Sequence, residues 1–383
     1  MIYIREGSHV HTLLLLLATV GEYPVSSLHL LGSKRTWKTL IQKLCKTQEY
    51  CLKDADKHFR CKLITVSGKG KQKTVRLHVS SLVILEKLDP DAYRYYQTHF
   101  DWHHFSGNRY HIDRHHRIAE ALVMCLRAGI MCWPHKLPDP DSVEVRRNEI
   151  SEPLFYLSLA LKDFWEGEMN KTKFSRMVGT VLCPGFCFMV YNSRGTLMKW
   201  SGNGESKVQN YLSVQFCMRL PGGTIRSAIL FGDNYLVAQR TLEEAQQRRR
   251  YDLRFDNVYR HIHFVPLNEF GIKQLRTLLV EDWHQAHLDI LYDEEEQQGN
   301  VFRYEFDAVI DGVGQISFID GDLCKLIRVR DAMRTNPKLK YTIVCYPEQV
   351  SMIQEYFVEF RGTGRLSIST VSIDEVLNIL MEE

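Results

Sequence analysis

Four side chains in the last quarter of the chain have the types and spacing of a metal-dependent hydrolytic site. Asp307 is expected near the start of one strand, and Asp320 and Asp322 follow the next strand, with Lys325 three residues later. Carboxylates from adjacent strands can hold one Mg²⁺, which activates a water molecule and offsets the charge of a phosphate. These four residues are therefore candidate catalytic residues for cleavage of a phosphodiester.

A structural interpretation of the same residues stays open. In metal-dependent nucleases of this kind a lysine stands two positions after the second acid, but here Asp322 occupies that position. Acids at strand ends need no catalytic function, and Asp322 is of the residue type that caps helix N-termini. The structural interpretation is favoured. No cofactor or resident metal is then expected, and Mg²⁺ enters only if the residues form a nuclease.

A helix predicted over Ser33–Lys46 has two chemically different faces. Its apolar residues recur at the spacing of a buried stripe, and they are Trp37, Leu40, Ile41 and Leu44. The opposite face carries Lys34, Arg35, Lys38 and Gln42. A helix of this kind can lie in the major groove of DNA while its apolar side packs on a small core.

A glycine- and lysine-rich loop follows between two predicted strands, Cys61–Val66 and Thr74–Val79. Lys69, Lys71, Lys73 and the nearby Arg76 could contact DNA phosphates from this loop, as the wing of a winged helix-turn-helix does. Residues 34–76 hold 13 lysines and arginines against 3 acids, a local net charge of +10, whereas the whole chain nets only +3. The positive charge is thus concentrated in one small module.

The elements that must position this module precede it. Helices are predicted over His9–Val20 and Ser26–Leu31, and Gly32-Ser33 forms the turn and N-cap before the basic helix. The apolar run Leu13–Leu17 is too short to cross a membrane and lacks the flanks of a signal peptide, so it is assigned to the first helix. With ten scattered cysteines, this favours a cytoplasmic protein with free thiols and no membrane contact.

The rest of the chain alternates short strands with helices, which predicts a mixed α/β fold. A helix is expected over Pro153–Trp165, and a hairpin of Gly179–Asn192 and Thr196–Trp200 is expected to turn between them. At 383 residues the chain should form several domains. The predicted organisation is a winged-helix domain (1–90), a helical connector (91–152) and an α/β region (153–383), the last divided into 153–222 and 223–383.

These residues resemble the replication-relaxation family of mobile genetic elements, which includes relaxases of the restriction-endonuclease-like type. The basic helix Ser33–Lys46 and the glycine–lysine loop are similar to that family's N-terminal DNA-binding domain. The segment Arg114–Leu122 is similar to the histidine-containing helix that opens the family's second domain. The resemblance covers about the first third of the chain.

The family's nuclease motif can be placed on this sequence in two registers. The first matches Val178–Thr180, then Met198–Ser206, then Lys207 and Tyr211, with 153–222 as a degenerate nuclease-like subdomain. In it the two metal-binding acids fall on Lys199 and Ser201, which cannot supply carboxylates. The second register keeps the acids at Asp307, Asp320 and Asp322 but places them about a hundred residues later in the chain. The loss of both acids in the first register implies a nuclease-like fold that binds DNA or protein but does not cleave DNA.

The resemblance implies a relaxase-like DNA-binding protein of a conjugative or mobilisable element, acting in plasmid mobilisation without an intact nuclease site. Double-stranded DNA is the expected partner, conjugation or replication proteins are further candidates, and a homodimer stays open. Two alternatives remain: a Mg²⁺-dependent nickase that uses Asp307, Asp320 and Asp322, and a winged-helix transcription regulator.

Overall fold

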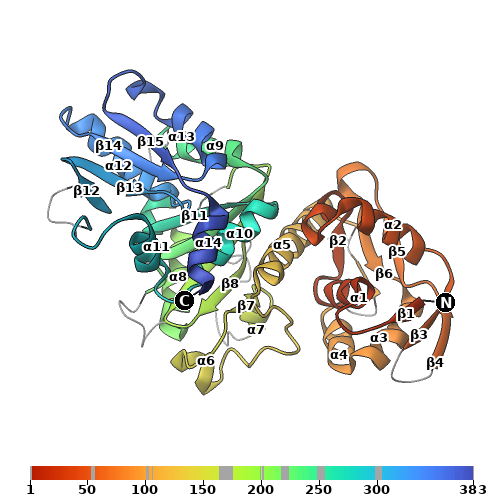
Figure 1. Cartoon of the computed structure of the whole chain (residues 1–383). Helices are drawn as coiled ribbons and strands as arrows, with labels where there is room; N and C mark the ends of the chain where they lie inside the picture. The colour runs from red at the N-terminus through yellow and green to blue at the C-terminus, as the bar shows by residue number, and fades with distance from the viewer. Residues whose placement is uncertain are drawn as a thin grey trace. The chain divides into compact units, whose positions relative to one another are not determined.

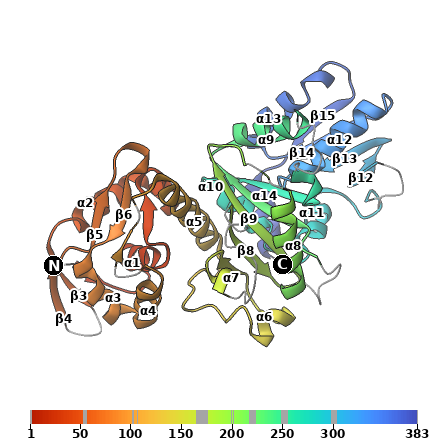
Figure 2. The same cartoon turned by 180° about the vertical axis from the view of Figure 1, so that it is seen from behind.

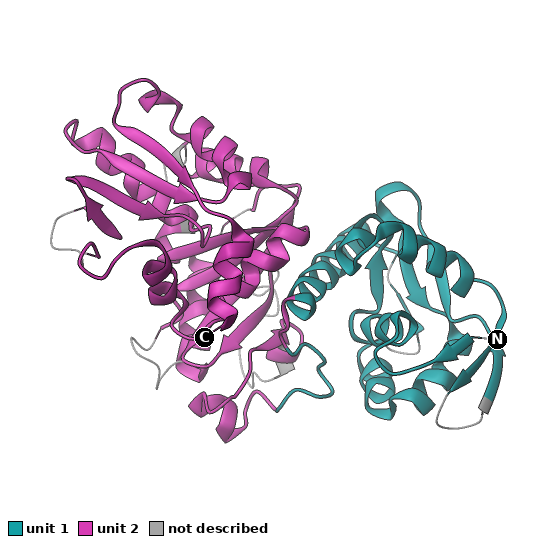
Figure 3. Cartoon of the chain, viewed as in Figure 1, with its two compact units in different colours: residues 1–127, 131–138 teal, residues 128–130, 139–383 magenta. Residues whose placement is uncertain are grey.

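The computed structural model describes residues 2–52, 57–100, 103–105, 107–163, 176–198, 200, 202–216, 224–247, 255–297 and 304–382. These residues form a mixed α/β protein with 49% helix and 22% strand in four small sheets (Figures 1 and 2), which confirms the mixed α/β class predicted from the sequence. The chain divides into two compact units (Figure 3). Unit 1 comprises residues 1–127 and 131–138, and unit 2 comprises residues 128–130 and 139–383.

Unit 1 begins with a strand, β1 (Ile2–Ile4), and a buried helix, α1 (His9–Val20). The side chain of Ser8 accepts a hydrogen bond from the backbone N–H of His11 and so caps the helix. The apolar run that could have suggested an export segment, Leu13–Leu17, is wholly buried in this helix. The predicted first helix is confirmed at both ends.

The next elements in chain order alternate short helices and strands. They are β2 (Glu22–Pro24), the 3₁₀ helix η1 (Val25–Leu31), α2 (Lys34–Leu44), β3 (Gln48–Leu52), β4 (Lys57–Cys61), β5 (Ile64–Ser67), the 3₁₀ turn η2 (Gly70–Gln72) and β6 (Thr74–Leu77). β6 pairs antiparallel with both β2 and β5 in one sheet. In a second sheet β3 pairs parallel with β1 and antiparallel with β4. The hairpin β3–β4 was not predicted.

Helices complete unit 1: η3 (Val79–Ser81), α3 (Leu82–Leu88), α4 (Pro90–His99) and the long α5 (Arg109–Ala128). The hydroxyl of Ser27 in η1 donates to a carboxylate oxygen of Glu120 in α5 at 2.5 Å, and both residues are buried. Arg127 donates to the carbonyl of Leu30 at 3.0 Å. Most of the predicted connector therefore packs with the first module, and the first compact unit extends well beyond residue 90.

Unit 2 contains a five-stranded sheet in the order β11-β10-β9-β8-β7. Its strands are β7 (Leu154–Leu157), β8 (Met177–Cys183), β9 (Phe186–Arg194), β10 (Ser227–Gly232) and β11 (His261–Pro266). β7, β8 and β9 are antiparallel neighbours, whereas β9, β10 and β11 are parallel. Helices α8 (Asn203–Phe216) and α9 (Tyr235–Gln247) make the parallel crossovers. Because β9 pairs with β10, the expected division at residue 222 does not separate two sheets.

Two sequence predictions in this region are wrong. The segment expected as a helix from Pro153 begins instead with the buried strand β7 and continues in the short helix α7 (Ala160–Asp163). The predicted hairpin turns near Gly185, which has a φ of +84°, and not at residues 192–195. Strands this thoroughly buried read as continuous apolar runs, so hydrophobic periodicity neither identifies them as strands nor locates the turn.

The second sheet of unit 2 has the order β12-β13-β14-β15. β12 (Ala308–Ile310) pairs antiparallel with β13 (Val313–Ser317), and β13, β14 (Tyr341–Cys345) and β15 (Leu366–Thr370) are parallel. The helices of this part are α10 (Glu269–Thr277), α11 (Trp283–Leu291), α12 (Leu323–Thr335), α13 (Val350–Tyr356) and α14 (Ile373–Glu382), and a short helix α6 (Val143–Arg147) precedes β7. A core cluster centred on Ile319 and Tyr346 packs against α14.

No helix among the described residues is long and apolar enough to cross a membrane.

Candidate nucleic-acid interface

Helix α2 has the two faces that the sequence predicts. Trp37, Ile41 and Leu44 are buried, and the indole N–H of Trp37 donates to the carbonyl of Leu31 at 2.9 Å. The side chains of the opposite face are exposed, and they are Lys34, Arg35, Lys38 and Gln42. Ser33 caps the helix by accepting from the N–H of Thr36. The four predicted contact residues therefore stand together on one exposed helix face.

The predicted wing is the loop between β5 and β6. Lys69, Lys71 and Lys73 are exposed, as a phosphate contact requires. Gly68 has a φ of +78°, and a Cβ there would lie 2.5 Å from the carbonyl oxygen of Gln72, so the turn needs glycine. The loop contains the 3₁₀ turn η2.

Two backbone hydrogen bonds tie this hairpin to the preceding helices, one at the start of β5 and one at the end of the loop. The N–H of Leu63, just before β5, donates to the carbonyl of Leu44 at the end of α2 at 3.2 Å. The N–H of Val25 donates to the carbonyl of Lys73 at 2.9 Å. Burial raises the pKa of the Cys45 thiol at the C-terminal end of α2, and the charges of Lys62 and Lys73 lower it in part. The base of the lysine loop thus lies close to the C-terminal end of α2.

Arg76 differs from the other predicted DNA contacts. Its guanidinium lies 3.0 Å from a carboxylate oxygen of the buried Glu22, its partner across the β2–β6 pair, and its centre is 4.6 Å from the ring centroid of Phe105. An arginine held in this way stabilises the fold of unit 1 by keeping Glu22 from being buried unpaired. Its prediction as a phosphate contact finds no support in this geometry.

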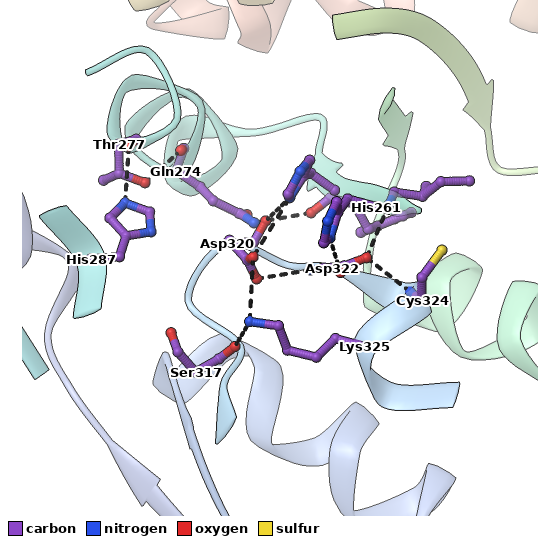
Figure 4. A network of polar contacts seen from close by, with 12 residues as sticks. His261, Gln274, Thr277, His287, Ser317, Asp320, Asp322, Cys324 and Lys325 are labelled. Carbon is purple, nitrogen blue, oxygen red and sulfur yellow. Dashed lines mark hydrogen bonds and ion pairs between the residues drawn. The ribbon is translucent and has the colours of Figure 1, made fainter. Parts of the chain in front are cut away.

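The four candidate catalytic residues come together in unit 2, and all are buried, with exposed fractions of 8% for Asp307, 2% for Asp320, 0% for Asp322 and 2% for Lys325. The ammonium nitrogen of Lys325 lies 3.2 Å from Oδ2 of Asp307 and 3.8 Å from Oδ2 of Asp320. It also donates to the carbonyl of Ser317 at 2.9 Å (Figure 4). Burial would lower the pKa of Lys325, but the surrounding carboxylates raise it above its usual value.

Asp322 faces a different set of partners. Its Oδ1 accepts from the N–H groups of Cys324 and Ile262 at 3.0 Å each, so it caps α12 and also holds β11. Its Oδ2 lies 2.8 Å from Nδ1 of His261 (Figure 4) and 3.4 Å from Arg328. Burial alone would raise the pKa of Asp322, but these neighbours hold it well below its usual range.

The loop Asp320–Asp322 docks on β11 and so joins the two sheets of unit 2. The N–H of Phe264 donates to the carbonyl of Gly321 at 2.9 Å, and His263 and Asp322 form an isolated bridge. Nδ1 of His263 lies 3.1 Å from the carbonyl oxygen of Asp320. The sequence therefore does not predict the main partners of Asp320 and Asp322, which are His261 and His263 on β11. Their His-x-His spacing is the one sequence feature that could have pointed to them.

The contacts of these side chains favour the structural interpretation over a site for Mg²⁺. The ammonium of Lys325 occupies the position between Asp307 and Asp320, and both oxygens of Asp322 are already hydrogen bonded. Among the residues that the structure describes, no group of three or more His, Cys, Asp or Glu side chains is arranged to hold a metal ion. The arrangement is that of a buried charge network around the N-cap of α12.

The first register of the nuclease motif is met only in part. Val178–Thr180 lies on β8, and Lys207 and Tyr211 lie on α8. Met198 and Trp200 lie outside any strand, and Lys199 and Ser201 fall outside the described residues. Glu205 is buried, 3.7 Å from Arg176.

No protein-family model matches this chain, and neither the curated proteins nor the solved structures contain a match to it.

Proposed function

We propose that unit 1 is a winged-helix domain that binds double-stranded DNA, with α2 in the major groove and residues 68–73 as the wing. The observation that carries the proposal is the division of α2 into a buried apolar face and an exposed face of Lys34, Arg35 and Lys38. The order of elements supports it, because α1, β2, η1, α2, β5 and β6 follow one another as the helices and strands of a winged helix do, with one hairpin inserted.

Unit 2 is, in this proposal, a relaxase-like α/β body without an intact nuclease site. A structural role for the acids is supported by their burial and by their partners. Asp307, Asp320 and Asp322 are buried. Their carboxylates are paired with Lys325, His261 and backbone N–H groups. The resemblance to relaxases extends the proposal to a cytoplasmic protein of a conjugative or mobilisable element. No disulfide joins the cysteines of the described residues, which suits a reducing compartment.

The test is the affinity of the full chain for duplexes selected from a random 30-bp library (about three helical turns). The change is Lys34→Ala, Arg35→Ala and Lys38→Ala together. Each base or phosphate contact is worth about 1 kcal/mol or more, so affinity should fall by about 100-fold or more at fixed salt. Fluorescence anisotropy measures it, and circular dichroism checks that the variant is folded.

The matched control removes three exposed cations elsewhere in unit 1, with Lys87→Ala, Arg109→Ala and Lys136→Ala. It lowers the net charge equally and should leave affinity within about threefold. A wild-type chain that selects no duplex from the library would refute DNA binding. Equal affinity losses in both triple variants would refute the assignment of α2.

A further inference from the structure

The unpredicted hairpin β3–β4 is fixed to the C-terminal end of α2. The side-chain amide of Gln48, the first residue of β3, donates to the carbonyl of Lys43 in α2 at 2.9 Å. Just after β4, the N–H of Leu63 donates to the carbonyl of Leu44 at 3.2 Å. Since both strands are tied to the last turn of α2 at their base, the hairpin keeps a defined position beside that helix. Figure 1 shows β3 and β4 next to β1 in unit 1.

The hairpin directs its cationic side chains to solvent. Tyr50 is fully buried opposite Phe59, whereas His58, Arg60 and Lys62, at alternate positions, are exposed. The backbones of Lys46 and Lys62 lie close together at the base of the hairpin. Both residues stand between the Leu44–Leu63 hydrogen bond and the Gln48–Cys61 pair.

The charge of the segment that holds α2 and both hairpins is strongly unbalanced. The described residues of 34–52 and 57–76 include 12 of the 13 lysines and arginines of the segment, Lys53 being the one left out, and Glu49 is their one acid. Apart from Lys57, whose side chain is not described, four of these cations belong neither to the predicted helix contacts nor to the predicted loop contacts. They are Lys43, Lys46, Arg60 and Lys62, all exposed, and we name them the hairpin patch. Such a concentration of one sign is favourable beside a polyanion.

We propose that the hairpin patch binds the DNA phosphate backbone beside the groove that α2 enters, so that the hairpin β3–β4 acts as a second wing. This inference rests on the proposed function, because it needs α2 to face the duplex. Ammonium and guanidinium groups that contact phosphates add affinity and fix the orientation of the protein, but they carry no sequence information. The patch therefore sets the strength and salt dependence of binding, whereas α2 sets its selectivity.

The test replaces Lys46→Ala, Arg60→Ala and Lys62→Ala together in the full chain and leaves Lys43 in place, because Lys43 lies in α2. Affinity for a selected duplex and for a scrambled duplex is measured from about 50 to 200 mM KCl. Each phosphate contact contributes about 0.9 to the slope of log K against log salt, so the slope should decrease by about 2 to 3. The ratio of the two affinities should stay constant.

The control is again the Lys87→Ala, Arg109→Ala, Lys136→Ala variant, whose slope should equal that of the wild-type chain. An unchanged slope in the hairpin variant, with folding verified by circular dichroism, would overturn the second wing. A changed ratio of affinities would also overturn it, since the hairpin would then read bases. A wild-type chain that binds neither duplex would instead refute the proposed function, so the two failures are distinguishable.

Discussion

At the residue scale, exposure decides what a cation does in this protein. Lys34 and Lys325 have the same side chain and each follows a helix N-cap closely, at Ser33 and Asp322. Lys34 is exposed and available to a ligand, whereas Lys325 is enclosed by Asp307, Asp320 and the carbonyl of Ser317. The first is suited to binding, and the second to neutralising buried carboxylates.

Replacing Lys325 tests the structural role of the network. Lys325→Met leaves Asp307 and Asp320 buried without their cation, and removal of one partner of a buried ion pair costs about 3–5 kcal/mol. Denaturant unfolding measures the loss of stability, and the exchange rates of amide protons in β13 and α12 show whether the loss is local to the network. Lys338→Met, at an exposed lysine beyond α12, is the control and should change stability by less than about 0.5 kcal/mol.

The same variant separates structure from catalysis. If the wild-type chain nicks supercoiled plasmid with Mg²⁺ and Lys325→Met abolishes nicking at unchanged stability, the nuclease hypothesis replaces the structural role. Partly restored stability in the double variant Asp307→Asn, Lys325→Met would support the structural role, because the neutral amide at 307 needs no cation whereas Asp320 stays charged.

At the element scale, the position of a short loop depends on a single glycine. Gly321 has a φ of +71°, and a Cβ there would lie 2.5 Å from the side-chain amide nitrogen of Gln274 and 2.7 Å from the carbonyl oxygen of Phe264. Both atoms are engaged, since that amide donates to that carbonyl at 3.1 Å. The close approach allows the loop Asp320–Asp322 to hydrogen bond to β11 and so to place the N-cap of α12.

Gly321→Ala should therefore destabilise unit 2 by about 2–5 kcal/mol, through the left-handed backbone and the lack of space together. Gly362→Ala provides the comparison, because Gly362 has a similar φ of +75° with nothing within 4 Å of its Cβ position. That change should cost about 1–2 kcal/mol from the backbone alone. Thermal denaturation measures both, and equal losses would show that the contact with β11 is unimportant.

Elements differ in how far their sequences specify them. The pattern of α2 and its Ser33 cap predict that helix to within two residues. The sequence predicts a helix where the strand β7 lies, because a fully buried run such as Leu154–Leu157 shows no alternation of apolar and polar residues. The hairpin β3–β4 was missed because polar residues interrupt its alternation.

At the scale of the whole molecule, the proposed DNA-binding residues and the buried charge network belong to different compact units. The exposed cations that would bind DNA belong to unit 1, and the buried charge network belongs to unit 2. A ligand that binds one unit stabilises that unit by mass action and transmits nothing to the other without a coupling contact.

Hydrogen exchange of the full chain tests this division. A selected duplex at about 100 times its Kd should raise the opening free energy of globally exchanging amides in α1 and β6 by about 2.7 kcal/mol. Amides in β8, β10 and β14 should exchange at the same rate with and without DNA. Protection confined to unit 2 would contradict the assignment of the DNA-binding surface, and equal protection in both units would show that they are energetically coupled.

The sequence alone was sufficient for features that depend on neighbours along the chain. The faces of α2, the glycine turn of the lysine loop and the alternation of strands with helices follow from local periodicity, capping and backbone preferences. Contacts between distant segments were decided only by the tertiary structure. It brought His261 and His263 of β11 against the loop Asp320–Asp322, placed Lys325 between two carboxylates and paired Arg76 with Glu22. Whether a charged residue is exposed or enclosed depends on which remote segments pack around it, and local sequence preferences do not determine that packing.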